Sequence, residues 1–387
     1  MNYDSTIEIL SLIQERNLQK LPRRLRPFYE RIKFKNRAIL IFGPRGVGKT
    51  TFILSRIKNK SIFYLSTDNP LVSAVSLWDL GNAIFMKGYD GIAIDEVHYS
   101  KDWSIHLKAL YDAFPDKIIW ASDSSNLTLR HGIADLSRRF SRIEIPLMSF
   151  REYLALKEGV ILPVINPLSP DRKLIKKTMD SAKILYTFQN FMEEGFRPVF
   201  LEWDYQEQTM NIIEKTLHGD IPFFVPQITN IHFRLMNAIV GYLAMSKIPT
   251  INVEGLCNEW GISKVKLYQL LHVMDATGLI RIIYHKNDTK TFSKGAKIFL
   301  ADPSFYSVLG GEIGTRREAF VVAAFSNAGK KVFASKNEEA GDFLVDGAVI
   351  EVGGKNKSKK KADYVIRDNI DLPNRNIIPL WLLGFMY

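Results

Sequence analysis

The chain has 387 residues, of which 46% are hydrophobic and 24% charged, a composition that excludes disordered and collagen-like chains. Lysine and arginine outnumber aspartate and glutamate by 11, which favours a polyanionic partner such as nucleic acid. The one cysteine, Cys257, excludes a disulfide within the chain and a cysteine metal cluster. No apolar run reaches the roughly 20 residues of a membrane span, and the N-terminus does not resemble a signal peptide, so we expect a cytoplasmic protein without membrane contact.

The first part of the chain predicts an α/β fold. Apolar residues at helical spacing predict a helix over residues 5–18, and the basic stretch 20–37 that follows is interpreted as a solvated connector. Short, fully apolar segments then alternate with helical stretches, and we expect them to be strands: 38–42, 61–66, 91–94, 117–121 and 143–147. Such strands indicate a parallel sheet with helices on both faces, here a P-loop domain over residues 1–149.

The rest of the chain predicts three further regions. Residues 150–227 are helical and rich in aromatic residues, as expected of a helical lid or connector. Residues 228–300 have the order of a winged helix-turn-helix: three helices and then a hairpin. Residues 301–387 form a last α/β unit.

The winged helix carries polar and basic residues on its second helix and wing: Lys264, Lys266, Tyr268, Gln269, Lys286, Lys290, Lys294 and Lys297. This pattern favours insertion into a DNA groove with contacts to phosphates. A spacer or a protein contact is the alternative.

The first predicted strand runs into a G-x-x-x-x-G-K-T loop, which is the signature of a nucleotide phosphate site. The loop residues are Gly43, Pro44, Arg45, Gly46, Val47, Gly48, Lys49 and Thr50, and Thr51 continues into the next helix. Backbone N–H groups and the helix N-terminus would hold the phosphates. Lys49 would reach the β and γ phosphates, and the Thr50 hydroxyl would bind Mg²⁺.

Polar residues follow the other predicted strands at the same edge of the sheet. Asp95 would hold Mg²⁺ through water, and Glu96 would orient or deprotonate the attacking water. Ser124, after the strand at 117–121, would sense the γ phosphate. Arg138 and Arg139 would stabilise charge on the transferred phosphoryl group, within one chain or from a neighbouring subunit, with an ordinary surface ion pair as the alternative. We expect His98 to be a surface residue.

With these motifs, the chain resembles the prokaryotic AAA-type ATPases that join a P-loop domain to a restriction-endonuclease-like C-terminal region. The matching segments are GPRGVGKT (43–50), AIDEVHYSKDW (93–103), SDSSNL (122–127), DLSRR (135–139), MSFREYL (148–154), GTRREAF (314–320), and GDFLVDG with EVGGKNKS (341–358). The resemblance implies ATP as the nucleotide and Mg²⁺-dependent hydrolysis. Asp123 stands where relatives usually have glycine, which adds an acid beside the γ-phosphate position.

The C-terminal region contains a predicted hairpin that brings two carboxylates together. Asp346-Gly347 is a preferred two-residue turn, and counting outward from it pairs Asp342 with Glu351. Facing carboxylates are unfavourable unless a cation offsets them, so these two residues are a candidate for a second metal site.

That hairpin is similar to half of a PD-(D/E)xK nuclease site, and Glu318 resembles the helical acid of that fold. The position at which the nuclease pattern has lysine is Gly353, and Lys355 is the lysine that would reach back. An active nuclease, a silent binding remnant and a structural hairpin all remain open.

Three functional hypotheses follow. The first is an ATPase that uses hydrolysis to act on DNA or a DNA-bound complex. The second is a slow nucleotide-dependent switch that presents its C-terminal domains to a protein partner. The third is an ATP-gated, metal-dependent nuclease.

Overall fold

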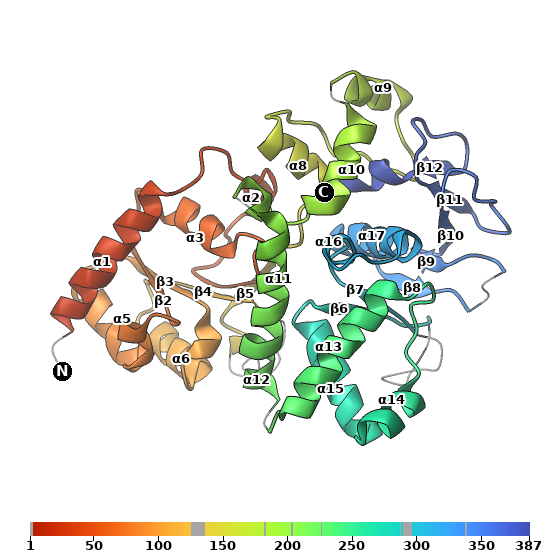
Figure 1. Ribbon diagram of the computed structural model, residues 1–387. Coiled ribbons are helices and arrows are strands. Elements are labelled where there is room, and N and C mark those ends of the chain that lie inside the picture. Colours follow the sequence, from red (N-terminus) through yellow and green to blue (C-terminus); the bar gives the residue numbers. More distant parts are fainter. Residues whose placement is uncertain are drawn as a thin grey trace. The chain divides into compact units, whose positions relative to one another are not determined.

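The structure is a computed structural model that describes residues 3–387 except 125–135, 182, 203, 226, 287, 289–295 and 337–338 (Figure 1). The chain forms two compact units, Met1–Pro146 and Leu147–Tyr387. The division lies close to the boundary expected after residue 149. The finer division of the second unit at residues 227 and 300 stays a prediction.

The first unit contains a five-stranded parallel sheet in the order β2-β3-β4-β1-β5. Its strands are β1 (Ala38–Phe42), β2 (Ile62–Ser66), β3 (Gly91–Asp95), β4 (Ile118–Asp123) and β5 (Ser141–Glu144). The predicted α/β fold with a parallel sheet is therefore confirmed. The last strand begins and ends earlier than expected: Ile145 still donates its N–H to Phe42 O at 2.8 Å, but Pro146 has no N–H with which to continue.

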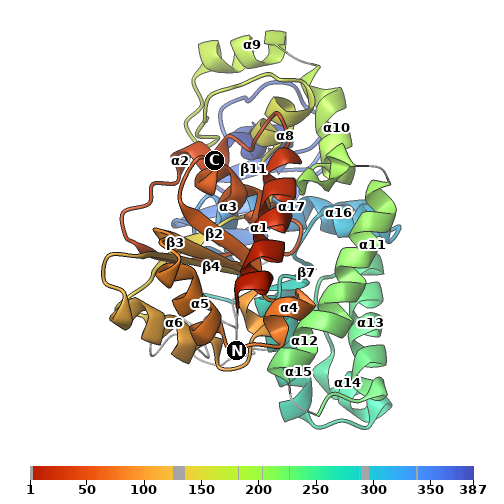
Figure 2. The same cartoon turned by 90° about the vertical axis from the view of Figure 1, so that its left-hand side faces the viewer.

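Helices cover both faces of this sheet, with α3 on one face and α5 and α6 on the other (Figures 1 and 2). The helices of the first unit are α1 (Asp4–Gln19), α2 (Phe28–Arg31), α3 (Lys49–Ile57), α4 (Pro70–Ser73), α5 (Leu77–Met86) and α6 (Trp103–Ala113), with a 3₁₀ turn η1 at Val97–Tyr99. Helix α1 closes the edge strand β2, because Gln14 accepts from Tyr64 N at 2.7 Å and donates to Ile62 O at 3.2 Å. The sheet is thereby buried on both faces and along one edge.

The second unit begins with a helical region. Its helices are α8 (Phe150–Lys157), α9 (Arg172–Ser181), α10 (Ile184–Glu194), α11 (Tyr205–Lys215), α12 (Ile221–Phe224), α13 (Asn230–Met245), α14 (Val253–Trp260), α15 (Lys264–Ala276), α16 (Ser304–Val308) and α17 (Ile313–Asn327). Short turns η2 (Pro198–Leu201), η3 (Thr216–Asp220) and η4 (Leu380–Phe385) complete it. A capping box between Ser149 and Glu152 starts α8.

The strands of the second unit form two sheets. The hairpin β6 (Ile280–Ile283) and β7 (Lys297–Leu300) follows α13, α14 and α15. A mixed sheet has the order β12-β11-β10-β9-β8. Its strands are β8 (Val332–Ala334), β9 (Phe343–Val345), β10 (Ala348–Gly353), β11 (Tyr364–Arg367) and β12 (Ile377–Pro379).

One aromatic core joins the predicted lid to the C-terminal region. Phe150 of α8 contacts Phe385 of η4, with ring centroids 5.6 Å apart. Phe188 of α10 contacts Phe320 of α17 at 5.5 Å. Residues 150–227 therefore share a hydrophobic core with residues 301–387. Within the described residues, no helix combines the length and apolarity that crossing a membrane requires.

Candidate active site

The loop between β1 and α3 has the backbone conformation that glycine permits. Gly46 and Gly48 have φ of 79° and 92°, in the left-handed region. At Gly43 a Cβ atom would lie 2.1 Å from Ile145 O, so a side chain there would collide with the end of the sheet. Helix α3 begins at Lys49, directly after the loop. The loop therefore presents backbone N–H groups and a helix N-terminus in one place, as phosphate binding requires.

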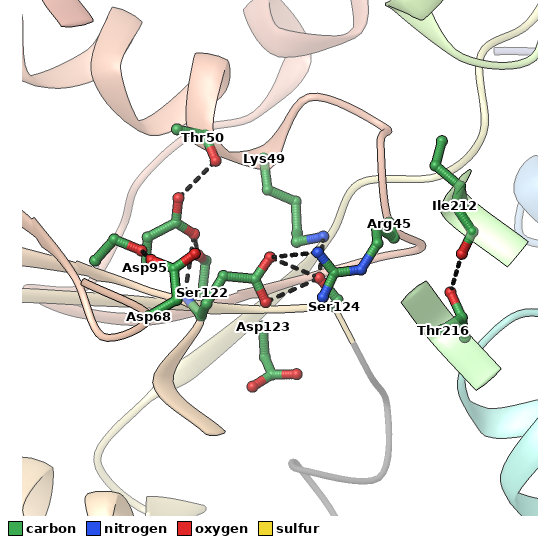
Figure 3. Close-up of polar contacts among 12 residues, drawn as sticks. Arg45, Lys49, Thr50, Asp68, Asp95, Ser122, Asp123, Ser124, Ile212 and Thr216 are labelled. Atoms are coloured by element: carbon green, nitrogen blue, oxygen red, sulfur yellow. Dashed lines mark hydrogen bonds and ion pairs between the residues drawn. The ribbon is translucent and has the colours of Figure 1, made fainter. Parts of the chain in front are cut away.

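Lys49 is buried, and its ammonium group is bound by neutral oxygens. Its Nζ donates to Gly43 O at 3.0 Å, Pro44 O at 3.2 Å and Ser124 Oγ at 3.1 Å (Figure 3). Burial lowers the pKa of Lys49, and the nearby carboxylates Glu96 and Asp95 oppose that effect. The lysine is thus held at the mouth of the loop by two carbonyls and a hydroxyl group.

Asp95, at the end of β3, is buried and fixed by hydroxyl groups. The Thr50 hydroxyl donates to its Oδ2 at 2.5 Å, and the Tyr64 hydroxyl donates to the same atom at 3.0 Å. The Ser122 hydroxyl donates to Oδ1. Since Thr50 itself is exposed, a hydroxyl and a carboxylate stand together at an accessible position. Both are oxygen ligands of the kind that Mg²⁺ prefers, so this pair fits a magnesium ion.

Glu96 follows directly and has a left-handed backbone, with φ of 52°. The Ser124 hydroxyl lies 2.9 Å and 3.0 Å from its two carboxylate oxygens, and Arg45 Nη1 lies 3.9 Å from Oε1. Burial raises the pKa of Glu96, and Lys49 pulls it in the opposite direction. Ser124 therefore bridges Lys49 and Glu96, and the structure brings together the residues predicted at three strand ends.

His98 is buried, with 8% of its surface exposed, and the expectation of a surface histidine is wrong. Its Nδ1 lies 2.9 Å from Asp123 Oδ2, and its backbone N–H donates to the same oxygen at 3.2 Å. The Asp123 carboxylate points away from Lys49 (Figure 3). Asp123 thus binds histidine instead of facing the lysine of the phosphate loop.

The two arginines predicted to act on phosphate lie apart from these contacts. Arg139 binds Asp112 through Nε and Nη2, both at 2.8 Å, on the surface. Arg138 is exposed. Asp135 and the segment 125–134 lie outside the described residues. The role of either arginine on phosphate stays a prediction.

Most basic side chains of the segment before β1 are exposed, as expected of a solvated connector, but two residues of this segment support the phosphate loop. Arg26 is 2% exposed and donates through Nη1 to Val47 O at 2.8 Å and Pro146 O at 3.0 Å. The Tyr29 hydroxyl donates to Gly48 O at 2.8 Å. Sequence reasoning missed both residues, because these contacts join segments that are far apart in the chain and no local pattern marks them.

A second charged cluster lies in the second unit, at the predicted hairpin. The strands pair in the expected register, with Val345 opposite Ala348. Glu351 is fully buried, and its Oε1 lies 2.9 Å from Lys357 Nζ and 3.0 Å from Lys360 Nζ. The expected lysine, Lys355, is exposed. The residues that approach the glutamate are therefore Lys357 and Lys360, because the chain turns after Gly353.

The other two acids of this cluster share one lysine. Lys297 Nζ lies 3.0 Å from Glu318 Oε2 and 3.5 Å from Asp342 Oδ1. Lys297, which was expected to contact phosphates from the wing, is thus largely buried in ion pairs. Burial raises the pKa of Glu318, and Lys297 opposes this. No group of three or more histidine, cysteine, aspartate or glutamate side chains suited to a metal occurs among the described residues. A metal role for Asp342 and Glu351 stays a prediction.

Comparison with known proteins bears on the first unit. Residues 35–154 match a family model described as an AAA domain. The matched part of the chain, most of which lies in the first unit, is therefore similar to an AAA domain. The AAA match takes in the phosphate loop, Asp95 and Glu96, and it ends within α8.

A relative matches a longer part of the chain than the AAA domain model does. The chain is 28% identical over 306 residues to the uncharacterized protein MJ1637 of Methanocaldococcus jannaschii, an alignment that covers 70% of this chain and 62% of the relative. It therefore spans less than two thirds of that relative's length.

Solved structures to which the chain is similar include the Walker-type ATPase PABY2304 of Pyrococcus abyssi, which is 14% identical, with 71% of this chain and 91% of that chain covered and a TM-score of 0.37. Two variants of RuvB from Thermotoga maritima are 15% and 16% identical, with 79% and 80% of this chain and 95% of each RuvB chain covered, at TM-scores of 0.32 and 0.33. The similarity to an AAA domain rests on the family match, and not on these scores.

Proposed function

We propose that the first unit binds ATP with Mg²⁺ and hydrolyses it. The observation that carries this proposal is the meeting of three groups at neighbouring strand ends: the phosphate loop with Lys49, the Thr50–Asp95 pair, and the Glu96 carboxylate. Bound Mg²⁺ would neutralise charge on the phosphate oxygens. Thr50 and Asp95 are the residues that would hold it.

The protein residues have separate tasks in this proposal. Lys49 exchanges its present partners, the carbonyls of Gly43 and Pro44, for phosphate oxygens. Glu96 orients the attacking water and accepts its proton. The neighbouring Ser124 hydroxyl holds the Glu96 carboxylate in place for this task. Ser124 contacts both Lys49 and Glu96, so it can link the phosphate position to the base.

We further propose that the second unit couples this hydrolysis to nucleic acid. Support comes from the succession α13, α14, α15 and the β6–β7 hairpin, which is the order of a winged helix. Lys264 and Gln269 on α15 are exposed, and Lys264 binds the exposed Glu254 at 2.8 Å, a surface pair that phosphate can displace. The excess of 11 positive charges adds to this support.

The test is phosphate release from ATP with Mg²⁺, with and without duplex or single-stranded DNA, at about 150 mM salt so that nonspecific binding is weakened. Glu96→Gln removes the base, and Glu30→Gln, on the surface helix α2, is the matched control. We expect DNA to stimulate release by the wild type and the control and not by Glu96→Gln. Turnover that ignores DNA would remove the coupling and favour a nucleotide-dependent switch. Absence of turnover would contradict hydrolysis itself.

A nuclease is a second candidate, because Lys357 lies beside Glu351 where sequence alone left the lysine position empty. Its test is cleavage of DNA with Mg²⁺ or Mn²⁺ by the wild type and by Lys357→Ala, with the exposed Lys355→Ala as control. Cleavage lost only in Lys357→Ala would support a nuclease. Equal cleavage in all three would identify a contaminant.

A further inference from the structure

Two buried polar residues beside Glu96 have no task in the mechanism above. They are His98, on the 3₁₀ turn η1, and Asp123, the last residue of β4. Asp123 is 2% exposed and His98 8% exposed. Burying a carboxylate costs several kcal/mol unless it is well paired. Their burial together, next to the proposed base, calls for a physical reason.

The geometry connects this pair to Glu96 in two ways. His98 Nδ1 lies 2.9 Å from Asp123 Oδ2 and 3.6 Å from Glu96 Oε2, so one nitrogen of the ring faces both carboxylates. The same Asp123 oxygen accepts the His98 backbone N–H at 3.2 Å. Asp123 therefore holds both the ring and the backbone of the turn that begins immediately after Glu96.

Glu96 needs such support because its backbone is in the left-handed region, which is unfavourable for a residue with a side chain. The Thr67 hydroxyl binds Glu96 O from the side of β2, and Ser124 binds the carboxylate from the side of β4. Tyr99 packs against the His98 ring, with the two ring centroids 4.1 Å apart. The ring is thus held by Tyr99 and Asp123, with its Nδ1 near Glu96.

We propose that Asp123 is a positioning residue that acts through His98. It orients the Glu96 carboxylate, which in turn orients the attacking water. This proposal rests on the proposed hydrolysis of ATP. It assigns Asp123 to the glutamate, and not to phosphate or metal, because its carboxylate is bound by His98 and points away from Lys49 (Figure 3). His98 and Asp123 then form one functional unit, in which each residue depends on the other.

The test separates a hydrogen-bonding role from a role of the charge. Asp123→Asn keeps an oxygen that accepts from His98, whereas Asp123→Ala removes it. From the other side, His98→Asn keeps a donor near the position of Nδ1, and His98→Ala removes it. Asp90→Asn, an exposed acid that lies 3.8 Å from Lys117, is the control. For each variant, kcat and KM for ATP are measured with Mg²⁺, together with the affinity for a fluorescent ATP analogue.

We expect Asp123→Ala and His98→Ala each to lower kcat about tenfold, because a misplaced base loses its alignment with water. KM and the affinity for the analogue change less than twofold, since Glu96 does not hold the nucleotide, and unchanged affinity also shows that the variant folds. The double alanine variant is no worse than either single one. Asp123→Asn and His98→Asn restore kcat to within about threefold of the wild type.

Other outcomes overturn the proposal. If Asp123→Ala keeps the wild-type kcat, the pair has no positioning role. If Asp123→Asn loses as much as Asp123→Ala, the negative charge acts directly, on metal or phosphate. If a variant also loses affinity for the analogue, the pair supports the nucleotide site as a whole and not Glu96. A wild type without turnover removes the proposed hydrolysis, which the other three outcomes leave intact.

Discussion

The two charged clusters of this protein neutralise their charges by different means. In the first unit, hydroxyl groups bind Asp95, and two carbonyls and a hydroxyl group bind Lys49. In the second unit, lysines bind the carboxylates themselves, with Lys357 and Lys360 at Glu351 and Lys297 between two further acids.

This difference teaches what each cluster is ready to bind. Neutral hydroxyls fix a carboxylate without cancelling its charge, so Asp95 keeps its attraction for a cation. A lysine cancels the charge, and a metal must displace it first. The first cluster is therefore prepared for a metal and phosphate, whereas the second is balanced as it stands.

The largest effect is expected at Lys49. Lys49→Ala should lower the rate of ATP hydrolysis by more than about a hundredfold, because the loop loses the cation that contacts the β and γ phosphates. Lys58→Ala, at the exposed end of the same helix, should retain activity. Phosphate release measures both. Substantial turnover by Lys49→Ala would show that the loop is not the site of hydrolysis.

The second largest effect is expected from chelation of metal, which should affect the first cluster and not the second. EDTA should abolish ATP hydrolysis, because Thr50 and Asp95 lose the ion that they would hold, and leave the stability of the second unit unchanged. Hydrogen exchange of peptides from β10, with and without EDTA or added Mg²⁺, measures the second effect. If Mg²⁺ protects the β10 peptides from exchange and Glu351→Gln removes this protection, the second cluster holds a metal. The contrast between the two clusters would then be wrong.

Removing the lysines of the second cluster should cost stability. The double variant Lys357→Ala with Lys360→Ala leaves Glu351 buried without its cations. This should lower the free energy of unfolding of the second unit by about 3 kcal/mol. The loss lies at the lower end of what breaking a buried ion pair costs, because both lysines are partly exposed. Adding Glu351→Gln should recover most of this loss. Urea unfolding followed by exchange of β10 peptides measures it, with exposed Lys355→Ala and Lys359→Ala as control. Equal stability of all these variants would contradict the ion pairs.

The smallest effect is expected at Arg139. Because its guanidinium binds Asp112 on the surface, Arg139→Ala should change kcat by less than about twofold. Asp112→Ala, which removes this ion pair from the other side, is the matched variant. A loss of a hundredfold or more in Arg139→Ala alone would instead support action on phosphate, from within the chain or from a neighbouring subunit.

Local patterns foresaw most of the first unit. The parallel sheet and the meeting of Lys49, Asp95, Glu96 and Ser124 follow from buried strands, because the carboxyl ends of parallel strands share one edge. The burial of His98 did not follow, since it depends on a partner 25 residues away.

The second unit shows the same limit more strongly. Turn chemistry predicted the hairpin register through Asp346-Gly347. It did not predict which lysine reaches Glu351, because the path of the chain after Gly353-Gly354 decides that. Nor did it predict that Phe150 packs on Phe385, since aromatic residues carry no signal of their partner.

The contacts of Arg26 and Tyr29 with the phosphate loop bear on how the domain can be excised. The AAA match begins at residue 35. A fragment cut to that match would leave behind both side chains that hold the backbone at Val47 and Gly48. It would also lose Gln14, which closes the edge strand β2 and shields it from pairing with another molecule. A fragment that keeps the nucleotide loop supported therefore begins before Arg26, and one that also keeps the β2 edge closed begins at or before α1.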